Sequence, residues 1–215
     1  MFDISISAFL YQFAILAVPV LAAITFHEVA HGYAAFLLGD PTAKDAGRLT
    51  LNPIKHLDPL GAIALFIVKI GWAKPVPINP RYFKHPQHGL MITSIAGPAC
   101  NFLLAVIFAI IFHALILFFG TTNSDNVLNI VQPILRMCQA GVIVNIGLGI
   151  FNLLPIPPLD GSNILAGLLP PELAEKFMQN SKYGFVILIL LLLTGIVQKV
   201  IVPVIYGLAS LLVPL

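Results

Sequence analysis

The sequence predicts an all-α polytopic membrane protein, and three observations support this class. Hydrophobic residues make up 59% of the 215 positions and charged residues only 9%, whereas a soluble domain carries roughly 25% charged residues. Several apolar blocks reach the length of about 17 to 25 residues that a spanning helix needs. Ionisable side chains stand inside the first block, where their energetic cost marks a working site. The chain length fits one integral-membrane domain over residues 1–215.

The first three apolar blocks set the order of the expected spans. Residues 5–38 form the first block, which is either one tilted helix or a short segment broken near Pro19 and then a helix. We favour the break, because proline interrupts helical hydrogen bonding. The second and third blocks cover residues 90–119 and 134–154. The polar connection from Gly120 to Gln132 contains no Lys or Arg, so we expect it on the external side.

The C-terminal part adds a fourth apolar block, over residues 183–213, and its path stays open. The block is either one span or a hairpin that turns near Gln198–Lys199 and Pro203. The stretch before it, residues 155–182, is expected on the cytoplasmic side, because successive spans alternate between the two sides.

A segment that does not span is expected between the first two blocks. Residues 60–72 are apolar but too short to cross, and the spaced prolines of KPVPINP exclude a helix after them. We therefore expect a short re-entrant or extended segment, and Ala62 to Ile78 as a strand edge for an extended peptide. The positive-inside rule places the region in the cytoplasm. It holds seven of the eleven basic residues: Lys44, Arg48, Lys55, Lys69, Lys74, Arg81 and Lys84.

The sequence HEVAH inside the first block is typical of a zinc site. His27 and His31 are four residues apart, so both imidazoles lie on one helical face and reach one metal ion. Glu28 follows the first histidine, flanks the metal and is placed to take a proton from water. The alternative, a polar patch that only pairs internally, accounts less well for this pattern at membrane depth.

A catalytic zinc ion needs a third protein ligand, and Asp160 is the best candidate. It follows an apolar block directly, and Pro155, Pro157 and Pro158 break the helix just before it. A broken helix can turn a carboxylate inward. The alternative, an N-cap aspartate for a short helix that starts near Ser162, stays open at this point.

The combination of HEVAH with NLLPIPPLDG at residues 152–161 closely resembles the site-2 protease family of intramembrane zinc metalloproteases, peptidase family M50. The likeness extends to RLTLNP at residues 48–53, HLDP at 56–59, AKPVPINP at 73–80 and the Ala96-Gly97-Pro98 sequence with Asn101. These motifs resemble the compact subgroup that lacks PDZ and CBS domains.

The resemblance implies a fold and a set of site residues. It implies a three-helix catalytic core within about residues 5–170, with additional membrane segments at about 183–213. It also implies His27, His31 and Asp160 as ligands of one Zn²⁺ per chain, with Glu28 as general base. Asn152 matches a family asparagine near the active site, where it could stabilise the developing oxyanion. An ordinary hydrogen bond between helices is the alternative for Asn152.

Two further histidines are weighed against a metal role. His56 could approach the metal as a gating ligand, but a loop histidine that pairs with Asp58 or with backbone is the simpler interpretation. His113, in the second block, is expected to hydrogen-bond another helix rather than bind metal.

The function implied is that of an intramembrane zinc endopeptidase, which hydrolyses peptide bonds within or near transmembrane segments of other proteins. Its expected partners are membrane-protein substrates with a transmembrane segment and the lipid bilayer, with no nucleic acid. We expect a multi-pass protein of the cell membrane. The active site is expected toward the cytoplasmic side, because His31 lies only about two turns, roughly 10 Å, from the end of its block. The substrate, its cleavage sequence and the oligomeric state are not encoded in recognisable form.

Three other functions are weighed. A membrane zinc protease that trims prenylated C-termini uses a glutamate as third ligand, but Glu172 and Glu175 lie in a hydrophilic stretch and lack the aspartate that this class places four residues on. A divalent-metal transporter or sensor would also place His and Asp at membrane depth, but it gives no reason for Glu28 beside His27. A non-catalytic member that only binds membrane segments is disfavoured, since all expected catalytic positions are filled.

Overall fold

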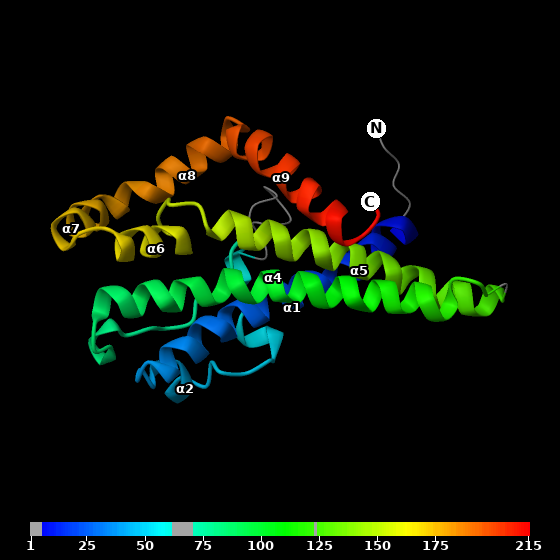
Figure 1. Cartoon of the computed structure of the whole chain (residues 1–215), viewed down its shortest axis with the longest axis horizontal. Coiled ribbons are helices and arrows are strands. Elements are labelled where there is room, and N and C mark those ends of the chain that lie inside the picture. The colour runs from blue at the N-terminus through cyan, green and yellow to red at the C-terminus, as the bar shows by residue number, and fades with distance from the viewer. Residues whose placement is uncertain (1–5, 62–70, 123) are drawn as a thin grey trace.

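The computed structural model describes residues 6–61, 71–122 and 124–215, and in this part the protein is helical (Figure 1). Four described helical stretches are long and apolar enough to cross a membrane: α1 (Ile6–Leu37), α4 (Pro86–Phe119), α5 (Asp125–Asn152) and the stretch Pro171–Leu193. The all-α polytopic membrane fold expected from the sequence is thereby confirmed.

Helices α4 and α5 lie side by side along the long axis of the molecule, and α1 crosses both of them obliquely (Figure 1). These three helices contact one another pairwise and form the core that carries the site. The other helical elements of the described residues are shorter. They are α2 (Thr42–Asp45), η1 (Pro53–Lys55), η2 (Pro80–Tyr82), α6 (Asp160–Leu168), α7 (Pro171–Gln179), η3 (Asn180–Tyr183), α8 (Gly184–Leu193) and α9 (Ile196–Leu212). Elements α7, η3 and α8 follow one another directly and make up the stretch Pro171–Leu193.

Helix α1 is continuous from Ile6 to Leu37, so the break expected near Pro19 is wrong. Pro19 is fully buried inside the helix. A proline removes one helical hydrogen bond, but an irregular backbone exposed to lipid would leave several groups unpaired at once. Continuing the helix is therefore the less costly solution within the membrane.

Helix α5 begins earlier than expected. The connection predicted to run to Gln132 is helical from Asp125 onward, and the helix continues through Pro133. Asp125 in the first turn places a negative charge at the positive end of the helix dipole, which favours a start at this point.

The C-terminal block is split at Gly195, where the chain bends sharply between α8 and α9 (Figure 1). Gly195 has a φ of 72°, a left-handed conformation that glycine adopts at little cost. The turn expected near Gln198–Lys199 or Pro203 is wrong, because these residues lie within α9. Helix α9 returns from the bend to pack against α5.

The helices pack closely because small residues face large ones. A Cβ on Gly141 would lie 2.5 Å from the Phe108 ring, and one on Gly149 would lie 3.0 Å from the Phe102 ring. Small residues at such positions let helices approach in a membrane, where no hydrophobic effect drives them together. The buried core comprises Ala105, Ala109, Phe112, Cys138, Val142, Ile146, Ala209 and Val213.

Candidate metal centre

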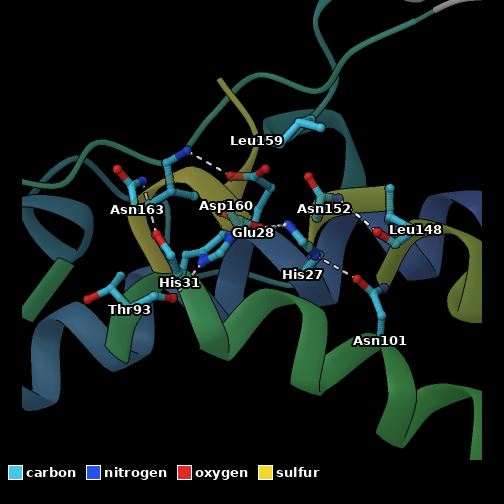
Figure 2. A network of polar contacts seen from close by, with 12 residues as sticks. His27, Glu28, His31, Thr93, Asn101, Leu148, Asn152, Leu159, Asp160 and Asn163 are labelled. Carbon is cyan, nitrogen blue, oxygen red and sulfur yellow. Dashed lines mark hydrogen bonds and ion pairs between the residues drawn. The ribbon is translucent and has the colours of Figure 1, made fainter. Parts of the chain in front are cut away.

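Three potential ligand atoms converge between α1 and α6: Nε2 of His27, Nε2 of His31 and Oδ2 of Asp160. The two nitrogens are 3.0 Å apart, and each lies 3.2 Å from the carboxylate oxygen. Figure 2 shows the two rings and the carboxylate pointing toward one another. The structure therefore brings together the three residues that the sequence proposes as metal ligands, across more than a hundred residues of chain.

The size of this triangle fits a zinc ion. Tetrahedral zinc with bonds of about 2.0 to 2.1 Å to nitrogen and oxygen places its ligand atoms about 3.3 Å apart. The observed separations of 3.0 to 3.2 Å are close to that value. Oδ2 of Asp160 is buried and makes no hydrogen bond, so its lone pairs are available to a metal.

Both imidazoles are held in the tautomer that binds metal through Nε2. Nδ1 of His31 lies 2.7 Å from the carbonyl of Thr93, which can only accept, so Nδ1 carries the proton. Nδ1 of His27 lies 2.6 Å from Oδ1 of Asn101 and donates to it. Each neutral ring then turns the lone pair of Nε2 toward the other ring and toward Asp160. Three lone pairs that meet in this way repel one another unless a cation lies between them.

The orientation of Asn101 is itself fixed by a buried amide chain. Its Nδ2 donates to the carbonyl of Ala23 at 3.1 Å and to Oδ1 of Asn145 at 3.0 Å. Nδ2 of Asn145 in turn donates to the carbonyl of Gly141 at 2.8 Å. Both asparagines are 0% exposed. The chain joins α1, α4 and α5 and leaves Oδ1 of Asn101 facing His27 (Figure 2).

Gly97 on α4 makes room for the two histidine rings. A Cβ at this position would lie 2.5 Å from Nε2 of His31 and 2.7 Å from Cε1 of His27. The rings therefore lie directly against the backbone of α4. In the sequence, Gly97 and Asn101 stand out only as family-like residues without an assigned role, and Thr93 and Asn145 were not predicted to belong to the site. Polar residues inside apolar spans were the available signal for the asparagines.

Glu28 is buried beside the ligands but is not one of them. Its Oε2 accepts a hydrogen bond from the backbone N–H of Val76 at 2.8 Å. Oε1 is the oxygen left for proton transfer. The extended segment before η2 thus contacts the side chain that the sequence proposes as general base.

Asp160 is the first residue of α6, and Leu159 precedes the helix as N-cap. No side chain caps this helix, so the alternative of an N-cap aspartate for a helix starting near Ser162 is wrong. Helix α6 packs on α4, and its first turn lies directly against the backbone that follows α5, because a Cβ on Gly161 would lie 2.2 Å from the carbonyl oxygen of Leu153. This close approach places the Asp160 carboxylate over the α1 histidines.

Asn152 is the last residue of α5, and its side chain is drawn in the same close view as His27 and Asp160 (Figure 2). Its Nδ2 donates to the carbonyl of Leu148 within its own helix at 3.0 Å. Because an amide nitrogen carries two hydrogens, a second donor is left for another acceptor. The role of Asn152 toward a substrate stays a prediction.

His56 and His113 follow their simpler interpretations. His56 is fully buried, and its Nε2 lies 2.8 Å from the carbonyl of Thr50. It does not belong to the metal-binding group found among the described residues. Nε2 of His113 lies 2.8 Å from the carbonyl of Leu212, which confirms the expected hydrogen bond to another helix.

Comparison with known proteins identifies the family of the chain. The model of peptidase family M50 matches residues 120–194. The chain is 40% identical over 194 residues to "Putative zinc metalloprotease YwhC" of Bacillus subtilis (strain 168). The aligned region covers 87% of this chain and 84% of that protein. It is 30% identical over 189 residues to "Putative zinc metalloprotease Rip2" of Mycolicibacterium smegmatis, covering 83% and 66% of the two chains. The protein of that name from Mycobacterium tuberculosis (strain H37Rv) is 28% identical over 201 residues, covering 89% and 71%. No solved structure matches the chain.

The spanning helices, the triangle of ligand atoms and these relatives define a membrane zinc metalloprotease of the site-2 type. The chain belongs to peptidase family M50. Zinc is the metal of this family, and its membrane proteases act on membrane-protein substrates.

Proposed function

We propose that this protein is an intramembrane zinc endopeptidase that cuts other membrane proteins within or near their transmembrane segments. The observation that carries the proposal is the convergence of three potential ligand atoms, from His27, His31 and Asp160, beside the buried carboxylate of Glu28. We assign one zinc ion per chain to these three ligands. A catalytic zinc site keeps three protein ligands and one open position, and this ligand set leaves that position free.

The chain's own residues would perform the proton transfers. When bound, the zinc ion supplies Lewis-acid activation of water. Glu28 keeps Oε2 on the Val76 N–H and uses Oε1 to accept the proton of the attacking water. The same carboxyl group then delivers this proton to the leaving amine. Burial of Glu28 and both histidines limits the access of other water molecules.

Asn152 is proposed to stabilise the scissile carbonyl as negative charge develops on its oxygen. One of its two amide hydrogens is used by Leu148, and the second is available for this contact. Its position as the last residue of α5, eight residues before Asp160, supports the role. Removal of an oxyanion donor typically costs about 3 to 4 kcal/mol of transition-state stabilisation.

The location of the site supports cleavage near the cytoplasmic face of the cell membrane. Helix α1 ends at Leu37, six residues after His31, which is about 9 Å along the axis. The stretch 44–84, which follows α1, carries seven of the eleven basic residues, as cytoplasmic regions do. We assign the catalytic core to residues 5–170 of a single domain, 1–215, with α8 and α9 outside the core.

The hypothesis that Ala62 to Ile78 offers a strand edge to the substrate falls largely on residues 62–70, outside the described residues. In the described part, Ala73 pairs with Leu57 in an isolated antiparallel bridge. The N–H groups of Lys74 and Val76 already donate to His56 and Glu28. Substrate pairing therefore stays a hypothesis, with these two donors excluded from it.

The first experiment compares cleavage of a panel of single-span membrane peptides in liposomes by wild type and Glu28→Gln, with bound zinc measured in both. We expect both proteins to retain zinc and only wild type to cleave. Glu172→Gln, an exposed glutamate on α7, serves as the matched control and should cleave like wild type. Zinc flux into the liposomes, without cleavage by any protein, would instead support a transporter. Zinc binding without cleavage or flux would support a non-catalytic member.

A further inference from the structure

The backbone that reaches Glu28 belongs to an extended segment, residues 73–79, that is fastened at both ends. Two buried charged side chains, which follow α1 in the sequence, hold this segment. Asp40 binds its C-terminal end and Arg48 binds its N-terminal end. We call these two side chains the clamp. Neither is a ligand in the metal centre, and the proposed reaction gives neither of them a role.

Asp40 is 0% exposed and accepts three hydrogen bonds. Its Oδ2 accepts from the backbone N–H of Asn79 at 2.7 Å, and its Oδ1 accepts from the backbone N–H of Thr42 at 2.9 Å and from the Thr42 hydroxyl. Burial acts to raise the pKa of Asp40, but the bonds from Thr42 and Asn79 outweigh it and hold the pKa below its usual value. The carboxylate therefore stays charged and keeps its bond to Asn79.

Arg48 is 7% exposed and donates to two successive carbonyls of the segment. Its Nη2 lies 2.7 Å from the carbonyl oxygen of Lys74, and its Nη1 lies 3.2 Å from that of Pro75. The backbone N–H of Lys74 donates to the carbonyl of His56 at 2.9 Å. The N-terminal end of the segment is thus fixed from two sides.

Val76 lies between these anchors, and its N–H is the group that meets Glu28. Prolines at positions 75 and 77 flank it, so it is an isolated donor in a stretch of restricted φ. On α1, Gly32 leaves a notch for the segment, because a Cβ there would lie 3.0 Å from Cγ1 of Val76 and 2.7 Å from Leu49. The side chain of Val76 therefore packs against Gly32 of α1, and its backbone N–H binds Glu28 of the same helix.

We propose that Asp40 and Arg48 are positioning residues that hold the Val76 N–H on Oε2 of Glu28 and so orient the general base. The inference rests on the proposed function of Glu28. The clamp acts on the carboxylate through the segment, without touching the reacting atoms. Loss of the clamp should lower kcat while zinc binding and KM change little, because Glu28 acts in the chemical step.

The first test measures amide hydrogen exchange at Val76 and Asn79 in the full-length, zinc-loaded protein, and needs no substrate. Asp40→Ala should speed exchange at Asn79, which loses its acceptor, and also at Val76, by about tenfold or more at each. Glu28→Ala should speed exchange at Val76 alone. Unchanged exchange at Val76 in Asp40→Ala would overturn the clamp.

The second test is a double-mutant cycle on kcat with Asp40→Asn and Val76→Pro, which deletes the donor. Each single variant should lose about 10- to 100-fold in kcat, the range for a hydrogen bond to a charged group. The double variant should resemble the more damaged single variant, because both changes act through one hydrogen bond. Effects that multiply would indicate a merely structural role and contradict the proposal.

Conservative rescue and matched controls complete the design. Arg48→Lys, which keeps the charge and a donor, should retain more kcat than Arg48→Leu. The exposed Asp45→Asn and Arg81→Leu should leave kcat and exchange at Val76 unchanged. Failure of wild type to cleave any peptide would contradict the proposed function alone, and the exchange pattern would then decide whether the clamp holds Val76 on Glu28.

Discussion

At the residue scale, the metal-binding state of His27 depends on an amide that is 74 residues away in sequence. Oδ1 of Asn101 accepts from Nδ1 of His27, and this bond both selects the tautomer and fixes the ring plane. The partners of Asn101 leave its amide one orientation, because the Ala23 carbonyl can only accept. A buried chain of hydrogen-bonded amides stabilises the fold only when each of its polar groups has a hydrogen-bond partner.

Replacement of Asn101 by Leu should therefore weaken zinc binding by about 10- to 100-fold, the range for loss of a residue that orients a metal ligand. Competition with a chelator of known affinity measures the change. Asn129→Leu, the same substitution at an exposed position of α5, is the control. Equal zinc affinity in the Asn101 variant and wild type would show that His27 needs no orienting partner.

At the element scale, the site depends on how closely α4 approaches α1. The absence of a side chain at Gly97 lets the histidine rings lie on the α4 backbone. A methyl group there would lie 2.5 Å from the metal-binding nitrogen of His31, so the helices or the rings would have to move. Overpacking of this kind costs about 1 to 3 kcal/mol.

We expect Gly97→Ala to lower the melting temperature and to lose most of its bound zinc. Metal analysis after purification and thermal unfolding in detergent measure both effects. Gly207→Ala on α9 is a matched control, because a Cβ at that position meets nothing within 4 Å. It should leave zinc content unchanged and stabilise α9 slightly. Full zinc occupancy in Gly97→Ala would argue against close helix approach as a requirement of the site.

At the scale of the whole molecule, the proposed metal centre would link the first spanning helix to α6, which packs on α4 and begins against the backbone that follows α5. An ion that binds only the folded arrangement stabilises it by about 2.7 kcal/mol at a hundred times its dissociation constant. Zinc held by the proposed ligands would therefore tie the two halves of the chain together.

Removal of zinc with a chelator should lower the melting temperature of wild type, and added zinc should restore it in a concentration-dependent way. Asp160→Asn should melt near the temperature of the zinc-free wild type and respond little to the chelator. A melting temperature of wild type that does not depend on zinc would contradict a link between α1 and α6 through the metal.

The sequence alone identified the membrane class, because hydropathy over a block of 17 to 25 residues depends only on composition. It also paired His27 with His31, since residues four apart share a helical face wherever the helix packs. Asp160 was found through the prolines before it, a local signal of a broken helix.

The tertiary structure decided the contacts that join distant parts of the chain. Nothing local indicates that Asn101 meets His27, that Gly97 lies under both rings, or that Val76 reaches Glu28. The tertiary structure also decided where a helix-breaking residue ends a helix: α1 continues through Pro19, whereas the chain bends at Gly195. Local propensity favours a break at both residues. Packing and the need to pair backbone groups in the membrane determine that the break occurs at Gly195 and not at Pro19.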